Sequence, residues 1–424
     1  MEAFYSFACS TIGKSHLDHG TVLQDASSFY EDDRCSVIAV SDGHGSENFP
    51  RSAQGSKYAC AAAIEAVQDF LDRLEPTQLQ PDAVRDAAVT QLCKNILLRW
   101  NIAVAEDAAQ NPFTEEEVAA VKEKYRSAYL AGRRVNHAYG TTLLLAILTQ
   151  DFFLAIRNGD GECVTMDEHG HFAAPVPAND KNEASFVTSL CDENAIEDFR
   201  YFYANQPLPI AVILGSDGVE NSYVHQDELF SLYRNICRKA ASEGGLIARE
   251  NVERALPVIT ARGSGDDVSI ACCLNIEKLQ RMSPILEQAA TQRREQLAAE
   301  KARRAAKRRQ FQDTAIDPSH IERQMPEQKL SADALSPVKE LEPSDTFTPE
   351  SASELGATAP ARAASATLGS PVSAHDFKSM KLPVAQQEGA SGIAVAANGT
   401  SDVGISALWP QDKAPLQDSH DSDH

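Results

Sequence analysis

The sequence predicts an α+β fold, a layered sandwich of two antiparallel β-sheets flanked by α-helices. Short apolar runs bounded by turn residues follow one another as in meanders, and amphipathic segments with helical spacing fill the gaps between them. The sequence contains no Gly-x-Gly-x-x-Gly or Walker-type loop, which argues against a doubly wound parallel sheet that binds a nucleotide.

The predicted strands are short apolar segments that stop at turn residues. They are 36–41, 142–166, 210–216 and 267–276. Segment 142–166 is long enough for a meander of three strands, with corners near Gln150 and near Asp160. Short strands joined in this way are typical of antiparallel sheets.

Four helices are expected around these strands. They are 57–74, 84–103, about 114–132 and about 226–243. The first two keep apolar residues on one face, which is interpreted as a core face. The third opens with a capping box, Thr114-x-x-Glu117, and runs towards Gly132. The fourth stops before Gly244, a residue that often ends a helix.

The 424 residues divide into three regions by composition. Residues 1–276 carry the predicted strands and helices and form the predicted folded domain. Region 277–310 contains a charged helical stretch, 286–310, that ends in basic residues; it is either a solvated helix or a docking helix for a partner or an acidic surface. Region 311–424 is rich in Ala, Ser, Pro, Asp and Glu, which predicts a disordered tail.

Charge and cysteine content exclude several classes of protein. A formal net charge of -22 argues against nucleic-acid binding and is compatible with binding cations. Nine cysteines without a Cys-x-x-Cys spacing fit a reducing compartment, and Cys272 and Cys273 are expected to be buried thiols. The sequence shows no signal peptide and no apolar run of the ~20 residues that span a bilayer, so a cytoplasmic protein outside the membrane is expected.

Four aspartates stand at predicted strand ends beside glycine. They are Asp42, Asp160, Asp217 and Asp266. Taken singly, an Asp-Gly pair is a common turn and needs no other role. If the strand ends converge, however, several carboxylates at one edge repel one another unless cations lie between them. Carboxylate and carbonyl oxygens suit hard ions such as Mg²⁺ and Mn²⁺.

Six short motifs occur in an order that carries a family resemblance. They are "QDA" (24–26), "SDGHG" (41–45), "YGTT" (139–142), "NGDG" (158–161), "SDGVENS" (216–222) and "GDDVSIA" (265–271). Together they resemble the metal-dependent protein serine/threonine phosphatases of type 2C, over about residues 1–276. The stretch "GKSHLDHGTVLQDA" (13–26) is most similar to a prokaryotic-type branch of that family.

The resemblance implies two Mn²⁺ or Mg²⁺ ions, with a third in bacterial members. Asp42 is implied to bridge the first two ions. The other implied ligands are Asp217 and Asp266 in the first site, the Gly43 carbonyl and Asp25 in the second, and Asp160 with Asp217 in the third.

The implied reaction is hydrolysis of phosphoserine and phosphothreonine in proteins by a hydroxide that bridges the metal ions. The leaving alkoxide needs a proton, and His44 is the candidate general acid. The alternative for His44 is a turn histidine that satisfies local backbone groups. The alternatives for the whole chain are a phosphatase-like adaptor that binds phosphorylated partners without turnover, and a generic metal-dependent esterase.

Two positions depart from the family pattern. The phosphate-binding arginine of the family corresponds to Gly20, so His16 is the candidate phosphate contact, or else an ordinary surface or capping histidine. The last motif reads Asp266-Asp267 where many members have Asp-Asn, and Asp266 is favoured as the ligand by its position.

Overall fold

The computed structural model of the protein describes residues 4–73, 79, 82–179 and 187–313. Its strands form two five-stranded antiparallel sheets, as predicted. In spatial order, the first sheet contains β1 (Phe4–Thr11), β10 (Val268–Asn275), β9 (Ala211–Gly215), β6 (Glu162–Met166) and β7 (Phe172–Ala173). The second contains β2 (Ala26–Glu31), β3 (Cys35–Ser41), β4 (Leu143–Thr149), β5 (Phe153–Asn158) and β8 (Arg200–Ala204). The predicted tail, 311–424, lies outside the described residues after Asp313.

The predicted three-strand meander is confirmed as three strands but not as one sheet. Strands β4 and β5 pair in the second sheet, whereas β6 pairs with β9 and β7 in the first. The chain therefore crosses between the layers at the Asp160 corner. The apolar pattern of this segment indicates where its strands run, but it does not indicate which sheet each strand joins.

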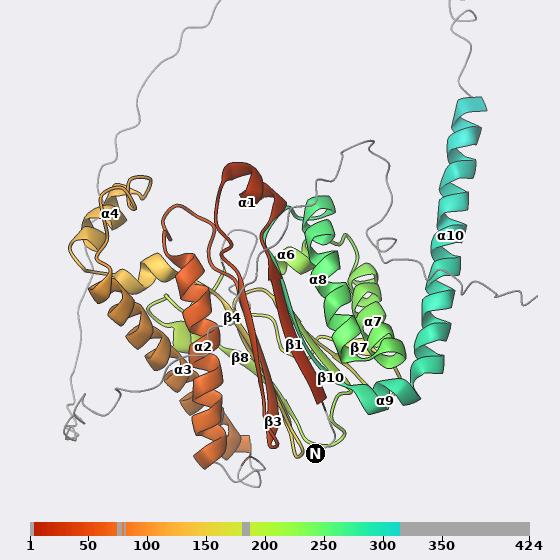
Figure 1. Ribbon diagram of the computed structural model, residues 1–424, viewed down its shortest axis with the longest axis horizontal. Helices are drawn as coiled ribbons and strands as arrows, with labels where there is room; N and C mark the ends of the chain where they lie inside the picture. The colour runs from red at the N-terminus through yellow and green to blue at the C-terminus, as the bar shows by residue number, and fades with distance from the viewer. Residues whose placement is uncertain (1–3, 74–78, 80–81, 180–186, 314–424) are drawn as a thin grey trace, which may run out of the picture. The chain divides into compact units, whose positions relative to one another are not determined.

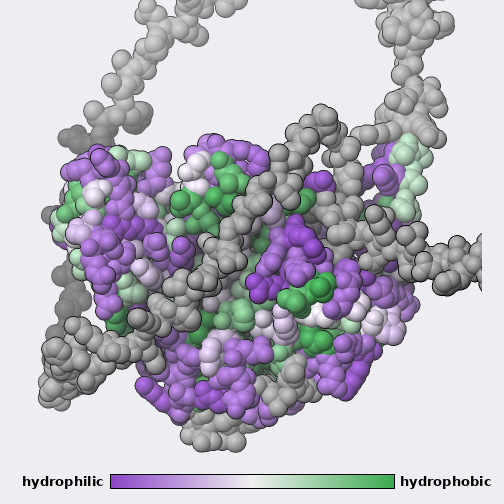
Figure 2. Space-filling view, viewed as in Figure 1, coloured by the Kyte–Doolittle hydropathy of each residue, from purple (hydrophilic) through white to green (hydrophobic). Residues whose placement is uncertain are grey.

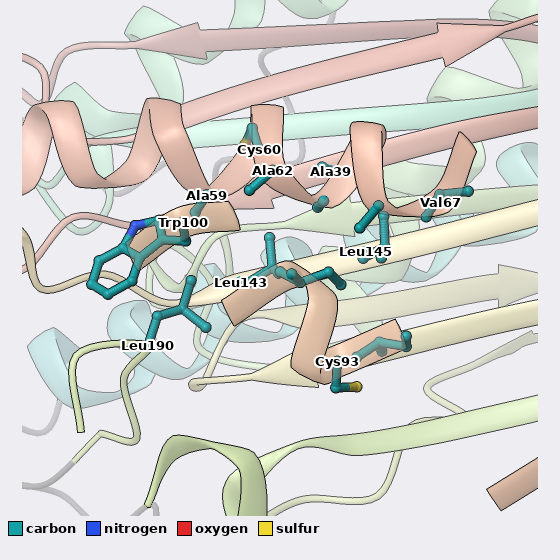
Figure 3. Close-up of a cluster of buried hydrophobic side chains, with 14 of the residues drawn as sticks. Ala39, Ala59, Cys60, Ala62, Val67, Cys93, Trp100, Leu143, Leu145 and Leu190 are labelled. Atoms are coloured by element: carbon teal, nitrogen blue, oxygen red, sulfur yellow. The ribbon is translucent and has the colours of Figure 1, made fainter. Parts of the chain in front are cut away.

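Helix pairs cover both outer faces of the sandwich (Figure 1). Helices α2 (Ser52–Arg73) and α3 (Asp82–Gln110) pack on the second sheet, and α7 (Gln226–Glu243) and α8 (Gly245–Arg262) pack on the first. Figure 3 shows the second-sheet core, where Trp100 of α3 lies near Leu143 of β4 and side chains of α2. A third apolar cluster fills the space between the sheets and includes Ile38, Leu144 and Leu214.

The remaining helices are shorter or lie at the edge of the sandwich. They are α1 (Lys14–His19), α4 (Glu123–Leu130), the 3-10 helix η2 (Val135–Tyr139), α5 (Ala195–Asp198), α6 (Asp217–Glu220), α9 (Ile276–Arg281) and α10 (Ser283–Asp313). On the surface, hydrophilic and hydrophobic residues are interspersed (Figure 2). Among the described residues, no helix is both long and apolar enough to cross a membrane. All nine cysteines are buried free thiols, which confirms the expectation for Cys272 and Cys273.

The predicted helix over 114–132 is wrong in its first half. The capping hydrogen bond forms, because the Glu117 N–H donates to Thr114 Oγ1 at 3.2 Å. The Glu117 carboxylate, however, accepts two hydrogen bonds from the Arg51 guanidinium, at 2.5 and 2.8 Å, in place of a bond back to the cap. Residues 115–120 therefore form turns, and the helix (α4) begins only at Glu123.

The predicted helix over 286–310 is confirmed as part of α10. Its start packs on the domain, since Met282 and Leu286 are buried and Glu287 forms an ion pair with Arg238 of α7 at 3.1 Å. Residues 298–307 are all exposed. The helix thus has an anchored beginning and a solvated, basic second half.

Candidate metal centre

Four of the predicted acidic residues follow or precede strands that end at the same edge of the sandwich. In the β2–β3 ladder Ala26 pairs with Ser41, so Asp25 and Asp42 occupy neighbouring positions just beyond the pair. In the other sheet, the Ser216 N–H donates to the Ser269 carbonyl at 3.0 Å. This pairing brings the end of β9, with Asp217, beside the beginning of β10, with Asp266.

The carboxyl group of Asp42 lies at the centre of this arrangement. Burial raises its pKa well above the ordinary value, and the negative charges of Asp25, Asp217 and Asp266 raise it further. Because the interaction between charges weakens with distance, these contributions agree with the strand pairing in placing the four predicted residues at one edge.

The backbone of Asp42 is fixed by the threonines of the "YGTT" motif. The Asp42 N–H donates to Thr142 Oγ1 at 3.0 Å, and the Asp42 carbonyl accepts from the Thr142 N–H at 2.8 Å and from Thr141 Oγ1 at 2.7 Å. The next residue, Gly43, has no room for a side chain: a β-carbon there would lie 2.6 Å from the Gln24 carbonyl oxygen. The turn after β3 is therefore held from both sides.

Asp25 is buried among other polar groups and is only 2% exposed. Burial raises its pKa to about 8, and the charges of Asp267 and Asp217 add to this, while hydrogen bonds from the Ser216 and Ser269 side chains oppose it. Its Oδ2 atom is buried without a hydrogen-bond partner, as is Oδ1 of Asp217. Buried oxygens of this kind are costly unless a cation or a proton satisfies them.

Asp160 also belongs to the acidic group. Burial raises its pKa to about 6, and Asp217 and Glu220 raise it further. Burial likewise raises the pKa of Glu162 to about 7, with an added contribution from Glu220. Glu162 and Glu220 were not predicted, although both follow an Asp-Gly motif within three residues, as "GDGE" and "SDGVE".

The donor set can be compared with the needs of a metal ion. Within the part of the chain that the structure describes, no group of three or more His, Cys, Asp or Glu side chains is arranged as a ready-made cage for an ion. Mg²⁺ does not need such a cage, because it binds through one or two carboxylates and keeps several waters. The unpartnered oxygens of Asp25 and Asp217 and the mutual repulsion around Asp42 therefore fit hard cations that keep part of their water shell.

The two adjacent aspartates before β10 differ sharply. The Asp267 side chain is 3% exposed, whereas the Asp266 side chain is 51% exposed. His16 contacts both: its Nδ1 lies 2.8 Å from Asp267 Oδ1 and its Nε2 lies 3.6 Å from Asp266 Oδ1. The candidate phosphate contact thus turns its two ring nitrogens towards carboxylates of the same acidic group.

His44 lies at the same edge, with its backbone N–H donating to the Gly140 carbonyl at 3.1 Å. Its ring packs edge-on against Phe49, with centroids 4.7 Å apart, and Phe49 stacks on His137. Burial lowers the His44 pKa to about 4, His137 lowers it further, and Asp217 acts in the opposite direction. His44 therefore lies near Asp217, one of the clustered acidic residues, and its ring is held by contacts with aromatic side chains.

Comparisons with known proteins add family information. A family model described as "Protein phosphatase 2C" matches residues 12–257, a range that contains all the predicted site residues except Asp266. No curated protein matches the chain. Similar solved structures include the serine/threonine phosphatase Stp1 from Staphylococcus aureus, with 12% identity and a TM-score of 0.41 over 64% of this chain and 95% of that chain. Another is the catalytic domain of the serine threonine protein phosphatase PstP in complex with two manganese ions, with 16% identity and a TM-score of 0.38 over 64% and 97%.

Proposed function

The chain belongs to the protein phosphatase 2C family, and from this premise we propose that it hydrolyses phosphoserine and phosphothreonine in proteins with Mn²⁺ or Mg²⁺. One observation carries the proposal: carboxylates from separate strand ends meet around Asp42, and two of their buried oxygens have no partner. Such an arrangement is unfavourable without cations and favourable around them.

The proposed ligands are those that the family resemblance implies. Asp42 would be a ligand of the ions. The other proposed ligands are Asp217, Asp266, the Gly43 carbonyl, Asp25 through water, and Asp160 for a third ion. When bound, such ions lower the pKa of water towards neutrality and neutralise the phosphoryl oxygens. The protein itself contributes a rigid edge, because hydrogen bonds fix the backbone of Asp42.

We propose His44 as the group that gives a proton to the departing serine or threonine oxygen. The ring is neutral at pH 7 in the free protein, because burial lowers its pKa to about 4. A bound phosphate dianion would raise this pKa, since a nearby negative charge favours the protonated ring. The role of His44 therefore depends on the bound substrate.

The regions outside the site keep the roles proposed for them. Residues 1–276 form the proposed catalytic domain, and α10 is a proposed docking element, supported by its exposed basic second half. The nine free thiols support a reducing location such as the cytoplasm.

The test is turnover of a phosphothreonine peptide by metal-stripped protein, with Mn²⁺ or Mg²⁺ added separately. We expect turnover only when a metal is added. Binding of the phosphopeptide without turnover in either metal would instead support the adaptor alternative. Faster cleavage of a carboxylic ester than of the phosphopeptide would support the generic esterase.

A further inference from the structure

We propose that the buried Asp267 and the partly exposed His16 form an anchor that holds two proposed metal ligands, Asp25 and Asp266, in position. His16 is then a positioning residue and not a phosphate contact. The inference rests on the proposed metal-dependent function, but its central test measures metal binding and needs no turnover.

The Asp267 carboxylate collects hydrogen bonds from two separate segments of the chain. Its Oδ1 accepts from the Gly13 N–H at 2.6 Å and from His16 Nδ1 at 2.8 Å. Its Oδ2 accepts from the Gln24 N–H at 2.6 Å and from the Asp25 N–H at 3.4 Å. A buried carboxylate with this many donors makes strong, charge-assisted bonds. Through them the start of β10 is tied to the turn before α1 and to the residues before β2.

The orientation of His16 follows from its partner. For Asp267 Oδ1 to accept from His16 as it does from the Gly13 N–H, Nδ1 must carry a proton. This fixes the ring and turns Nε2 towards Asp266, 3.6 Å away. Groups that hold a ligating carboxylate from behind commonly control the affinity of a metal site. A phosphate contact is disfavoured, because an anion at this ring would lie beside two carboxylates.

The "GKSH" segment (13–16) is built for this contact. A β-carbon on Gly13 would lie 2.5 Å from the Asp266 carbonyl carbon, so only glycine allows the close approach. The Ser15 N–H and hydroxyl both donate to the Gly265 carbonyl, at 2.8 and 2.6 Å. Three of the four residues therefore bind residues 265–267 directly.

The anchor also explains why Asp267 replaces the asparagine of many family members. Both of its oxygens accept from N–H donors, whereas an amide offers one acceptor and would turn its NH₂ group towards donors on the other side. The mismatch would move Asp25 or His16. In this chain Asp267 thus holds the neighbouring residues of the site in position, and Asp266 remains available as a ligand.

The experiment measures Mn²⁺ binding to metal-stripped full-length protein, by calorimetry or by the electron paramagnetic resonance signal of free Mn²⁺. His16→Ala and Asp267→Asn should each weaken binding by about 10- to 100-fold, the range typical for groups that support metal ligands. His16→Asn should bind more tightly than His16→Ala, because its amide can still donate to Asp267. His19→Ala is the matched control: His19 lies on the same helix and is exposed, and its Nδ1 pairs with the Ser15 carbonyl and not with Asp266 or Asp267, so binding should not change.

Unchanged Mn²⁺ affinity in both His16→Ala and Asp267→Asn would overturn the proposal. So would a His16→Ala protein that binds Mn²⁺ normally but shows a raised KM for phosphopeptide, which is the signature of a phosphate contact. If Asp267→Asn does not fold, the comparison of His16→Ala with His16→Asn decides alone. Weakened Mn²⁺ binding in a protein that never turns over phosphopeptide would support the anchor and refute the proposed function.

Discussion

Replacement of Asp25 by asparagine should stabilise the metal-free protein, and the gain should grow with pH. The folded carboxyl has a pKa of about 8, raised by burial from the ordinary value of 3.8. Between these two values the unfolded chain releases a proton that the folded protein keeps, so rising pH favours unfolding. Asparagine removes this proton from both states.

The size of the effect follows from the two pKa values. A pH of 7 is about 3 units above the pKa of the carboxyl in the unfolded chain. This difference corresponds to ~4 kcal/mol of lost stability in the wild type. At pH 4 the loss is close to zero. Asp25→Asn should therefore match the wild type near pH 4 and exceed it by a few kcal/mol at pH 7.

The assay is urea unfolding in a chelator at several pH values from 4 to 7. The control is Asp33→Asn, an exposed aspartate whose replacement should shift stability by less than about 0.5 kcal/mol. Added Mn²⁺ should then stabilise the wild type more than Asp25→Asn. The reasoning would be refuted by an Asp25→Asn protein whose advantage over the wild type does not increase with pH.

Three further predictions concern the edge of the site and the end of the domain. His44→Ala should slow turnover of phosphothreonine much more than of p-nitrophenyl phosphate, because nitrophenolate leaves without a proton; equal losses would indicate a structural role. Gly140→Ala should give the same kinetic pattern, since the added methyl would lie 2.7 Å from His44 Cδ2 and push the ring aside; unchanged kinetics would refute this contact. A chain that ends at 290 should keep its peptide turnover and melting temperature. A chain that ends at 276 should melt at a lower temperature, because it lacks the buried side chains of Leu279 and Leu286. Equal melting temperatures for the two chains would contradict this packing.

Strands buried on both faces could be predicted from the sequence, and half-exposed ones could not. Strands β3, β4 and β9 are buried along their full length, so their residues form continuous apolar runs. Strand β2, "ASSFYE", has two serines followed by two aromatic residues and is mostly half-buried or exposed, and β8, "RYFYA", is half-buried throughout. A search for apolar runs therefore assigns both segments to the surface. Strand β2 is instead positioned by its pairing with β3, and β8 by its pairing with β5.

Helix α8 was missed for a related reason. It has Pro257 in its interior and begins at Gly245, and both residues argue against a helix in an isolated sequence. Its burial against β1 and β10 outweighs these local preferences.

The acidic side chains of the site were predictable, whereas their supports were not. Aspartates that follow buried runs stand out in the sequence, as Asp42 and Asp217 do. The role of Asp267 depends on donors more than 240 residues away, at Gly13, His16 and Gln24. No local pattern encodes such a contact, because it arises only when β1 and β10 pair.

The central claim is that the carboxylates around Asp42 hold the ions on which turnover depends. The most direct test is a single Mn²⁺ titration of metal-stripped wild type and Asp42→Asn, with bound Mn²⁺ and phosphothreonine-peptide turnover measured on the same samples. We expect wild-type turnover to rise as Mn²⁺ binds, and a folded Asp42→Asn protein to lose both tight binding and turnover by orders of magnitude, because a neutral amide is a poor ligand for a hard cation. Full turnover in folded Asp42→Asn, or in wild type without any metal, would contradict the account.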